Sequence, residues 1–287
     1  MLSWIKLVEI EINSFCNRKC VWCPNTRFRR NKAIKMPYEV YEKIIHELKN
    51  CSYKGVISFS RYNEPMSDIL QFKNYLQLAR DILPDIKLVS NTNGDYLSRE
   101  NLDGLLLDEL SVMDYDCLGM EICLDRLKRL NVEIANVKYP YIFARYENIK
   151  LLYYVDWAKN ALLVDRGGFL KSEVRHFEHD MKWLNNKELR RKPCFEPMFF
   201  IGIDYNGDVV PCCQIRGDNP KHRKFILGNI NKSSLIDICS GEKISDFKKS
   251  IVNYDFKQYP LPCKYCQKGP GRYTRENPGI EFEEAAL

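Results

Sequence analysis

The sequence lacks several features that would assign it to a large class of proteins. No basic segment followed by an apolar stretch stands at its start, so no signal peptide is expected. No apolar run approaches the ~18 residues that a membrane-spanning helix needs, so we expect no membrane contact. Basic residues cluster only at residues 27–32 and the net charge is a modest +6, which does not indicate binding to nucleic acid. These absences favour an ordinary globular protein.

Cysteine, in contrast, is abundant, with twelve residues in a chain of 287. A chain that is not exported stays in a reducing compartment, where thiols persist and disulfides are rare. We therefore expect a cytoplasmic protein whose cysteines serve metal sites.

Three cysteines stand close together in Cys16-Asn17-Arg18-Lys19-Cys20-Val21-Trp22-Cys23. Zinc usually takes four ligands, and no further Cys or His follows this segment until His46. Three thiolates suit an iron–sulfur cube with one iron left open, which can bind a small chelating ligand. A structural zinc loop and three unrelated buried thiols are the alternatives.

Strand-like and helix-like segments alternate along the first half of the chain. Expected strands cover residues 7–12, 56–59, 86–90, 110–113, 132–137, 150–155 and 161–164. One expected helix starts after Pro37, and three more cover residues 69–82, 99–107 and 120–130. This alternation predicts an α/β fold with a parallel sheet and right-handed crossovers. About six units are too few for a closed eight-stranded barrel, so we expect an open, partial (β/α)6 barrel.

Polar loops follow the first three of these strands. They are residues 16–23, Ser60-Arg61-Tyr62-Asn63-Glu64-Pro65 and Asn91-Thr92-Asn93-Gly94, while Asp114 ends the fourth strand. Because the carboxyl ends of parallel strands meet at one rim, these loops are expected to converge on a site.

A second cysteine set lies in the last third of the chain. Its members are Cys194, Cys212, Cys213, Cys263 and Cys266. Residues 201–210 predict a β-hairpin with Asn206-Gly207 as its turn, which brings Cys194 towards Cys212. The terminal C-x2-C pair then completes a set of four thiols, which on chemistry alone suits zinc or a fully ligated iron–sulfur cluster equally well.

A change of composition separates the two cysteine sets. Gly167-Gly168 indicates a turn, and the charged residues 171–191 that follow are expected to be helical. We therefore expect two domains, residues 1–168 and residues 169–287, the second built on a hairpin and a helix.

The first cysteine set, with Trp22 directly before the third cysteine, resembles that of the radical S-adenosylmethionine (SAM) superfamily. The resemblance implies that Cys16, Cys20 and Cys23 hold a [4Fe-4S] cluster whose open iron binds SAM. Residues 62–65 resemble the family's Gly-Gly-Glu-Pro motif with Tyr62 and Asn63 in place of the glycines, which implies that Glu64 accepts hydrogen bonds from the SAM ammonium group. The remaining residues that the resemblance places at SAM are Trp22, Asn63, Ser90, Asn93 and Asp114. Ser90, Asn93 and Asp114 are candidate ribose contacts, with Asp116 as the alternative to Asp114.

The second set, with Asn-Gly-Asp, Pro-Cys-Cys and Leu-Gly-Asn-Ile segments, is similar to the twitch domain, a shorter relative of the SPASM extension of that superfamily. This similarity implies one auxiliary [4Fe-4S] cluster, with Cys194, Cys212, Cys263 and Cys266 as its ligands. It implies a dehydrogenase in which a 5′-deoxyadenosyl radical takes hydrogen from a sugar- or amino-cyclitol-like alcohol, which becomes a ketone. The auxiliary cluster accepts an electron, and an external one-electron reductant such as flavodoxin or ferredoxin is an expected partner.

Two residues correspond to substrate-contacting positions of such dehydrogenases, Tyr62 and Arg166, whereas Gln214 stands where a glutamate is expected. Epimerisation is a second reading, with Cys213 or Cys239 as the hydrogen-donating thiol. Peptide modification is a third; the first strand begins close to the start of the sequence, and we expect no separate leader-binding domain. A zinc-stapled interaction protein, with no enzymatic activity, is the last alternative.

Overall fold

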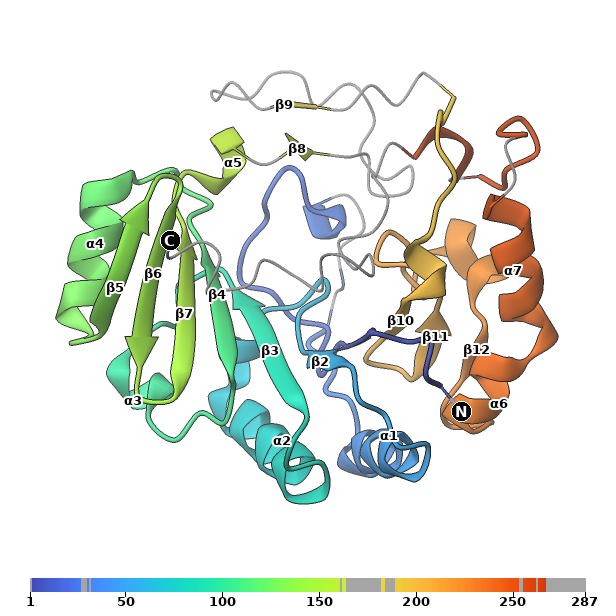
Figure 1. Cartoon of the computed structure of the whole chain (residues 1–287), viewed down its shortest axis with the longest axis horizontal. Helices are drawn as coiled ribbons and strands as arrows, with labels where there is room; N and C mark the ends of the chain where they lie inside the picture. Colours follow the sequence, from blue (N-terminus) through green and yellow to red (C-terminus); the bar gives the residue numbers. More distant parts are fainter. Residues whose placement is uncertain are drawn as a thin grey trace.

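The computed structural model describes residues 2–26, 30, 32–160, 162–163, 182–183, 189–252, 255–261 and 263–266. Its centre is a single curved sheet of ten strands with the order β12-β11-β10-β1-β2-β3-β4-β7-β6-β5 (Figure 1). Parallel neighbours at its middle are β1 (Leu7–Ile10), β2 (Val56–Ser58), β3 (Lys87–Thr92), β4 (Glu109–Met113) and β7 (Ile149–Tyr154). The sheet is open, and the predicted α/β class with a partial barrel is confirmed.

Helices connect the parallel strands and lie along the outer face of the sheet (Figure 1). They are α1 (Tyr38–Asn50), α2 (Ile69–Ile82), α3 (Arg99–Leu102) and α4 (Met120–Arg129), with α5 (Trp157–Asn160) after β7 and the short 3-10 turns η1 (Pro24–Thr26) and η2 (Pro65–Asp68) in the loops. In the described part of the chain, no helix is long and apolar enough to cross a membrane.

The expected sixfold β/α repeat does not continue past α4. There the chain forms an antiparallel meander of β5 (Glu133–Lys138), β6 (Tyr141–Tyr146) and β7, which places β5 at the sheet edge. The connections around β6 have only two residues each, and such short turns can join antiparallel strands but cannot hold a crossover. Strand β6 was missing from the predicted elements, which is why the repeat was overcounted.

The predicted hairpin is present, with β10 (Phe200–Ile203), β11 (Asp208–Val210) and a turn in which Gly207 has a φ of +85°. It does not form a sheet of its own. Strand β10 pairs in parallel with β1, Phe200 opposite Leu7 and Ile203 opposite Ile10, so the hairpin extends the sheet of the partial barrel. Strand β12 (Gly228–Asn229) pairs with β11 and forms the edge of the sheet opposite β5. The expected helix follows as α6 (Leu235–Ser240) and α7 (Glu242–Val252). This part of the chain also contains the 3-10 turns η4 (Glu196–Met198), η5 (Pro220–Phe225) and η6 (Cys263–Tyr265).

Two further expectations need correction. The helix expected over residues 99–107 ends at Leu102, because Gly104, with a φ of +67°, turns the chain towards β4. The helical character expected for residues 171–191 fails at β9 (Lys182–Trp183), which pairs with β8 (Leu162–Leu163) in a separate two-stranded sheet. The domain boundary predicted at residues 168–169 and the Arg166 side chain lie outside the described residues.

One large apolar core lies between the sheet and its outer helices. Alternation along β1 sends Val8 and Ile10 into this core and Glu9 to the opposite, inner face of the sheet. Helix α2 contributes Phe72, which is fully buried, whereas Leu70 on the same helix is 73% exposed.

These two positions give a matched test of the core. Phe72→Ala is expected to lower the free energy of unfolding by about 3–5 kcal/mol, because it leaves a cavity in a packed interior. Leu70→Ala should change it by less than about 0.5 kcal/mol. Urea titrations of both variants under anaerobic conditions measure the difference, and equal effects would contradict the packing described.

Candidate active site

The three-cysteine segment forms the loop that follows β1. Within it, the amide of Cys23 donates to the carbonyl of Cys20 at 2.9 Å. Arg18 ties the loop to its neighbours: its Nε lies 2.7 Å from Asp95 in the loop after β3, and its Nη1 lies 2.8 Å from Asp116 in the loop after β4. The convergence of loops predicted from the strand ends is therefore present.

Burial and the neighbouring thiols keep Cys16 and Cys20 neutral in the protein alone. Burial, with a smaller contribution from the neighbouring thiols, raises the pKa of Cys16 to about 11 and that of Cys20 to about 12. A cationic metal centre reverses this effect, because metal coordination deprotonates a thiol. In the described part of the chain, no three Cys, His, Asp or Glu side chains are grouped as a single metal ion would require. A four-iron cluster distributes its ligands over separate irons, so three partly buried, electrostatically coupled thiols suit it better than a single ion.

Glu64 lies at the same rim, after β2, and is 2% exposed. Its carboxylate accepts from the Thr92 hydroxyl and the Asn93 amide, each at 2.8 Å, and from the Met66 amide at 3.1 Å. Burial raises the pKa of Glu64 to about 7, although these donors act in the opposite direction. The side chain of Asn93 in turn donates to Asn17 in the cysteine loop at 2.8 Å. Glu64 and Asn93 are thus brought together with the three thiols.

The other residues expected at SAM have partners of their own. Asn63 accepts from the Arg61 amide within its loop, and buried Ser90 donates to the carbonyl of Asn91. Asp114 accepts from the backbone amides of Leu118 and Asp156. Their contacts with SAM stay predictions.

Trp22 belongs to a small aromatic cluster beside the cysteine loop. Its ring centroid lies 5.6 Å from that of Tyr115 and 5.5 Å from that of Trp157, and Cys20 packs against the same cluster. Sequence reasoning missed Tyr115 and Trp157, although each follows the end of a sheet strand, β4 and β7 respectively.

Several members of the second thiol set lie near one another, and their role as cluster ligands stays a prediction. Cys194 is buried in a small apolar cluster against which Cys212 and Cys263 pack. Burial raises the pKa of Cys263, and the nearby Cys266 and Cys194 thiols raise it further. All twelve cysteines are free thiols, so no disulfide competes for these positions.

Tyr62 reaches from the rim to the second thiol set. Its amide donates to Glu11 at 3.0 Å, and its hydroxyl donates to the carbonyl of Cys213 at 2.6 Å. The Cys213 thiol contacts the buried carboxylate of Glu196 at 3.6 Å, a neighbour that no sequence motif indicated. Gln214 donates to the same sulfur, while its Oε1 is buried and accepts no hydrogen bond from the described residues.

Cys239 is not brought to this site. It is 3% exposed in the large core, beside Cys51 and Glu47 at the C-terminal end of α1, and burial raises its pKa to about 12. That end of α1 precedes β2 and lies at the amino ends of the strands, opposite the cysteine loop.

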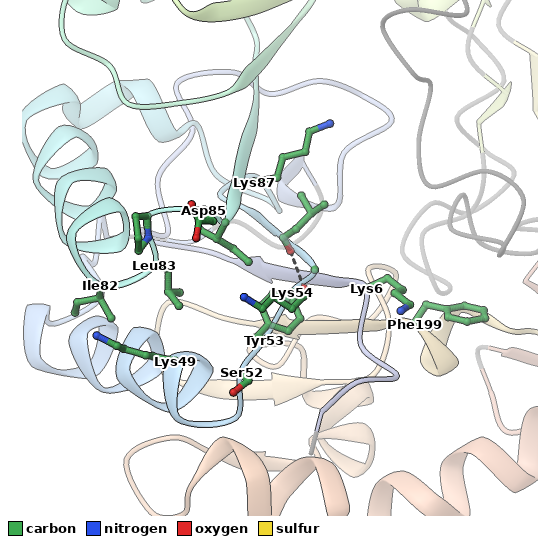
Figure 2. A pocket seen from close by; sticks show the side chains of 14 residues that line it. Lys6, Lys49, Ser52, Tyr53, Lys54, Ile82, Leu83, Asp85, Lys87 and Phe199 are labelled. Carbon is green, nitrogen blue, oxygen red and sulfur yellow. Dashed lines mark hydrogen bonds between the residues drawn. The ribbon is translucent and has the colours of Figure 1, made fainter.

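A cavity of about 700 Å³ also lies at the amino ends of the strands, away from both thiol sets. Figure 2 shows Tyr53 and Leu83 beside it, with Lys6, Lys49 and Lys54 around them. It contains none of the residues expected to bind SAM or substrate, so it is separate from the candidate active site.

Comparison with known families agrees with the second thiol set. Residues 194–267 match the SPASM family, described as an iron–sulfur cluster-binding domain. The match runs from Cys194 to just past Cys266. This match, the open sheet and the three-thiol loop agree with the predicted class, a radical SAM enzyme with a C-terminal cluster-binding domain.

Particular relatives agree with this class. The S-adenosyl-L-methionine-dependent 2-deoxy-scyllo-inosamine dehydrogenase of Niallia circulans is 25% identical over 263 residues, which cover 91% of this chain and 92% of that protein. The structure of BtrN in complex with AdoMet and 2-DOIA matches with a TM-score of 0.69 and 22% identity, over 94% of this chain and 97% of BtrN. AdoMet-bound anSMEcpe matches with a TM-score of 0.52 and 16% identity, over 91% and 89% of the two chains. The two structures share the fold of this chain.

The buried carboxyl of Glu64 predicts a specific pH dependence of stability. An unfolded glutamate releases its proton near pH 4.5, whereas the folded protein retains it until about pH 7. The stabilisation from this proton is therefore present below pH 4.5 and is lost as the pH rises to 7. Across that interval, the free energy of unfolding of the wild type minus that of Glu64→Gln should fall by on the order of 3 kcal/mol. Anaerobic urea titrations at several pH values measure it, and a constant difference would contradict it.

The adjacent Cys212 and Cys213 predict opposite effects on iron content. Cys212→Ala should remove about half of the iron from anaerobically reconstituted protein, since a four-iron cluster loses one of its thiolates. Cys213→Ala should leave the iron content unchanged, because its thiol is engaged by Glu196 rather than needed as a fifth ligand. Iron loss in the second variant alone would show that the ligand was assigned to the wrong residue.

Proposed function

We propose that this chain is a radical SAM dehydrogenase that oxidises an alcohol of a sugar- or amino-cyclitol-like small molecule to a ketone. The observation that carries the proposal is Tyr62, whose amide donates to Glu11 directly after β1 and whose hydroxyl donates to the carbonyl of Cys213, next to the expected ligand Cys212. The 25% identity to a SAM-dependent dehydrogenase over nearly the whole chain supports the reaction type.

Seven cysteines would hold the two iron–sulfur clusters. Those of the first set are Cys16, Cys20 and Cys23, and those of the second are Cys194, Cys212, Cys263 and Cys266. When bound, the clusters and SAM supply the electron transfer and hydrogen abstraction of the reaction. Glu64 is the residue that receives the SAM amino group, because its buried carboxylate is held at the same rim by three hydrogen bonds.

The substrate would lie near Tyr62 and Gln214. The Oε1 of Gln214 is a buried acceptor that takes no hydrogen bond from the described residues, and such atoms in folded proteins usually have a partner. This neutral amide oxygen can accept a hydrogen bond from a hydroxyl group of the substrate, which fits a polyhydroxylated ring. Arg166, by its resemblance, would bind the hydroxyl that is oxidised and favour its deprotonated form.

Oxidation is favoured over epimerisation by the surroundings of the two candidate thiols. Epimerisation needs a thiol that returns a hydrogen atom to the substrate. The thiol of Cys213 contacts the Glu196 carboxylate, and Cys239 is buried at the far end of the strands. In a dehydrogenase the second thiol set has its own role, because its cluster accepts the electron that the substrate loses.

The partners follow from the same chemistry. The first cluster needs an external one-electron donor, for which flavodoxin or ferredoxin is suited. Twelve free thiols favour a reducing compartment, and we place the protein in the cytoplasm. A peptide substrate is the alternative to a small molecule.

Product analysis tests the proposal. Reduced, reconstituted protein with SAM and 2-deoxy-scyllo-inosamine should form ketone and 5′-deoxyadenosine in equal amounts, because one hydrogen atom is abstracted per oxidation. In deuterium oxide, the attacked carbon should gain no deuterium. Replacing Cys16, Cys20 and Cys23 together by Ala should abolish SAM cleavage. Deuterium in the product, lost in Cys213→Ala, would instead establish an epimerase.

A further inference from the structure

Seven charged side chains form a network on the inner face of the sheet, beside Tyr62. Three are arginines and four are carboxylates: Arg30, Arg61, Arg216, Glu9, Glu11, Asp204 and Asp218. They come from β1, from the loops after β1 and β2, from the hairpin turn and from the segment after Cys213. The proposed reaction assigns no role to any of them.

Arg61 joins three of these parts of the chain. Its guanidinium group is fully buried, with Nε 2.9 Å from Asp204 and Nη1 3.0 Å from Glu9. Its Nη2 donates to the carbonyl of Ile215 at 2.8 Å. A strand of the partial barrel, the hairpin turn and the segment after Cys213 are therefore held by one side chain. A buried charge is retained only with such partners, because an unpaired one is strongly destabilising.

A second branch runs through Arg30 and Arg216. Arg30 contacts Glu11 at 2.7 and 2.9 Å and Asp218 at 2.7 Å, and Arg216 contacts Asp218 at 2.6 and 2.8 Å. Glu11 also accepts the amide of Tyr62. The backbone of Tyr62 and the segment after Cys213 thus share one set of charges.

The Tyr62 side chain is held by the same groups. Its ring centroid lies 5.6 Å from the guanidinium carbon of Arg61 and 5.4 Å from that of Arg216, both within the range of cation–π contacts. Its hydroxyl donates to the carbonyl of Cys213, directly after the expected ligand Cys212. A shift of Arg61 would therefore move Tyr62 and the ligand loop together.

We infer that Arg61 is a positioning residue: its pairs with Glu9 and Asp204 fix Tyr62 against the Cys212–Gln214 loop and so set how substrate oxidation is coupled to the auxiliary cluster. The inference rests on the proposed function. Arginine is required because its planar fork reaches three partners in three directions, whereas the ammonium of lysine is a single point charge.

The auxiliary cluster itself provides the first test, without any substrate. In full-length protein with Cys16, Cys20 and Cys23 replaced by Ala, only the second cluster contributes to the electron paramagnetic resonance spectrum. Arg61→Lys in this background should keep the iron content but shift the g-values and the reduction potential of the cluster. Arg80→Lys is the matched control, because Arg80 also makes a carboxylate pair and several carbonyl contacts but lies at the amino ends of the strands. It should change neither quantity.

Coupling provides the second test, in protein with both clusters. Arg61→Lys should still cleave SAM, but ketone per deoxyadenosine should fall by up to about a hundredfold, the effect of a 1 Å misplacement. An unchanged spectrum and ratio would overturn the inference. If Arg61→Lys loses its clusters, Tyr62→Phe decides: it removes only the hydroxyl, and a wild-type spectrum and ratio in this variant would overturn the inference too. Failure of the wild type to cleave SAM or to form ketone would overturn the proposed function instead.

Discussion

The structure depends on how charge is buried on the inner face of its sheet. Val8 and Ile10 of β1 pack on the outer helices, while Glu9 of β1 and Glu11 directly after it lie on the inner face. Carboxylates in such a place need cationic partners. Arg61 and Arg30 supply them from two different loops, and each of these arginines has a second partner in or beyond the hairpin. Pairing of the inner charges therefore brings the hairpin and the rim loops to the same strand.

This constraint explains why one sheet carries both the loop of the first thiol set and the hairpin that precedes Cys212. The pairing of β10 with β1 orders the hairpin backbone, and the pair of Asp204 with Arg61 fixes its turn. If the charges were buried without the pairing of β10 and β1, backbone groups of the hairpin would lack hydrogen-bond partners. If the strands paired without the charge pairs, the buried carboxylates and guanidinium groups would lack theirs. The sheet thus sets how the loop after β1 is placed relative to the hairpin that precedes Cys212.

The sequence was sufficient for features that depend on neighbouring residues. Helix α2 has the predicted bounds, 69–82, because its apolar spacing and the following Pro84 are both local signals. The hairpin turn followed from Asn206-Gly207, and the thiol loop from its spacing. Pairing across the fold was not accessible in this way. No spacing links residue 9 to residues 61 and 204, and nothing around Cys239 indicates that its helix packs against the end of α1. Strand β6 was missed because an antiparallel insertion departs from the repeat used to read its neighbours.

Glu64 shows why such a site is built from buried groups. In the protein alone, burial raises its pKa to about 7, so the ionised carboxylate is held in place at some cost in stability. Hydrogen bonds from Thr92 and Asn93 partly offset that cost and fix the orientation of both oxygens. A cationic group that binds at the rim would interact more strongly with this carboxylate, because the carboxylate is already desolvated. The same reasoning applies to the nearby thiols, whose burial disfavours the thiolate until a metal cluster binds. Both kinds of ligand are thus held in place at a cost to the stability of the protein without its cofactors. Binding of the cofactors and stability of the fold are therefore linked at this rim.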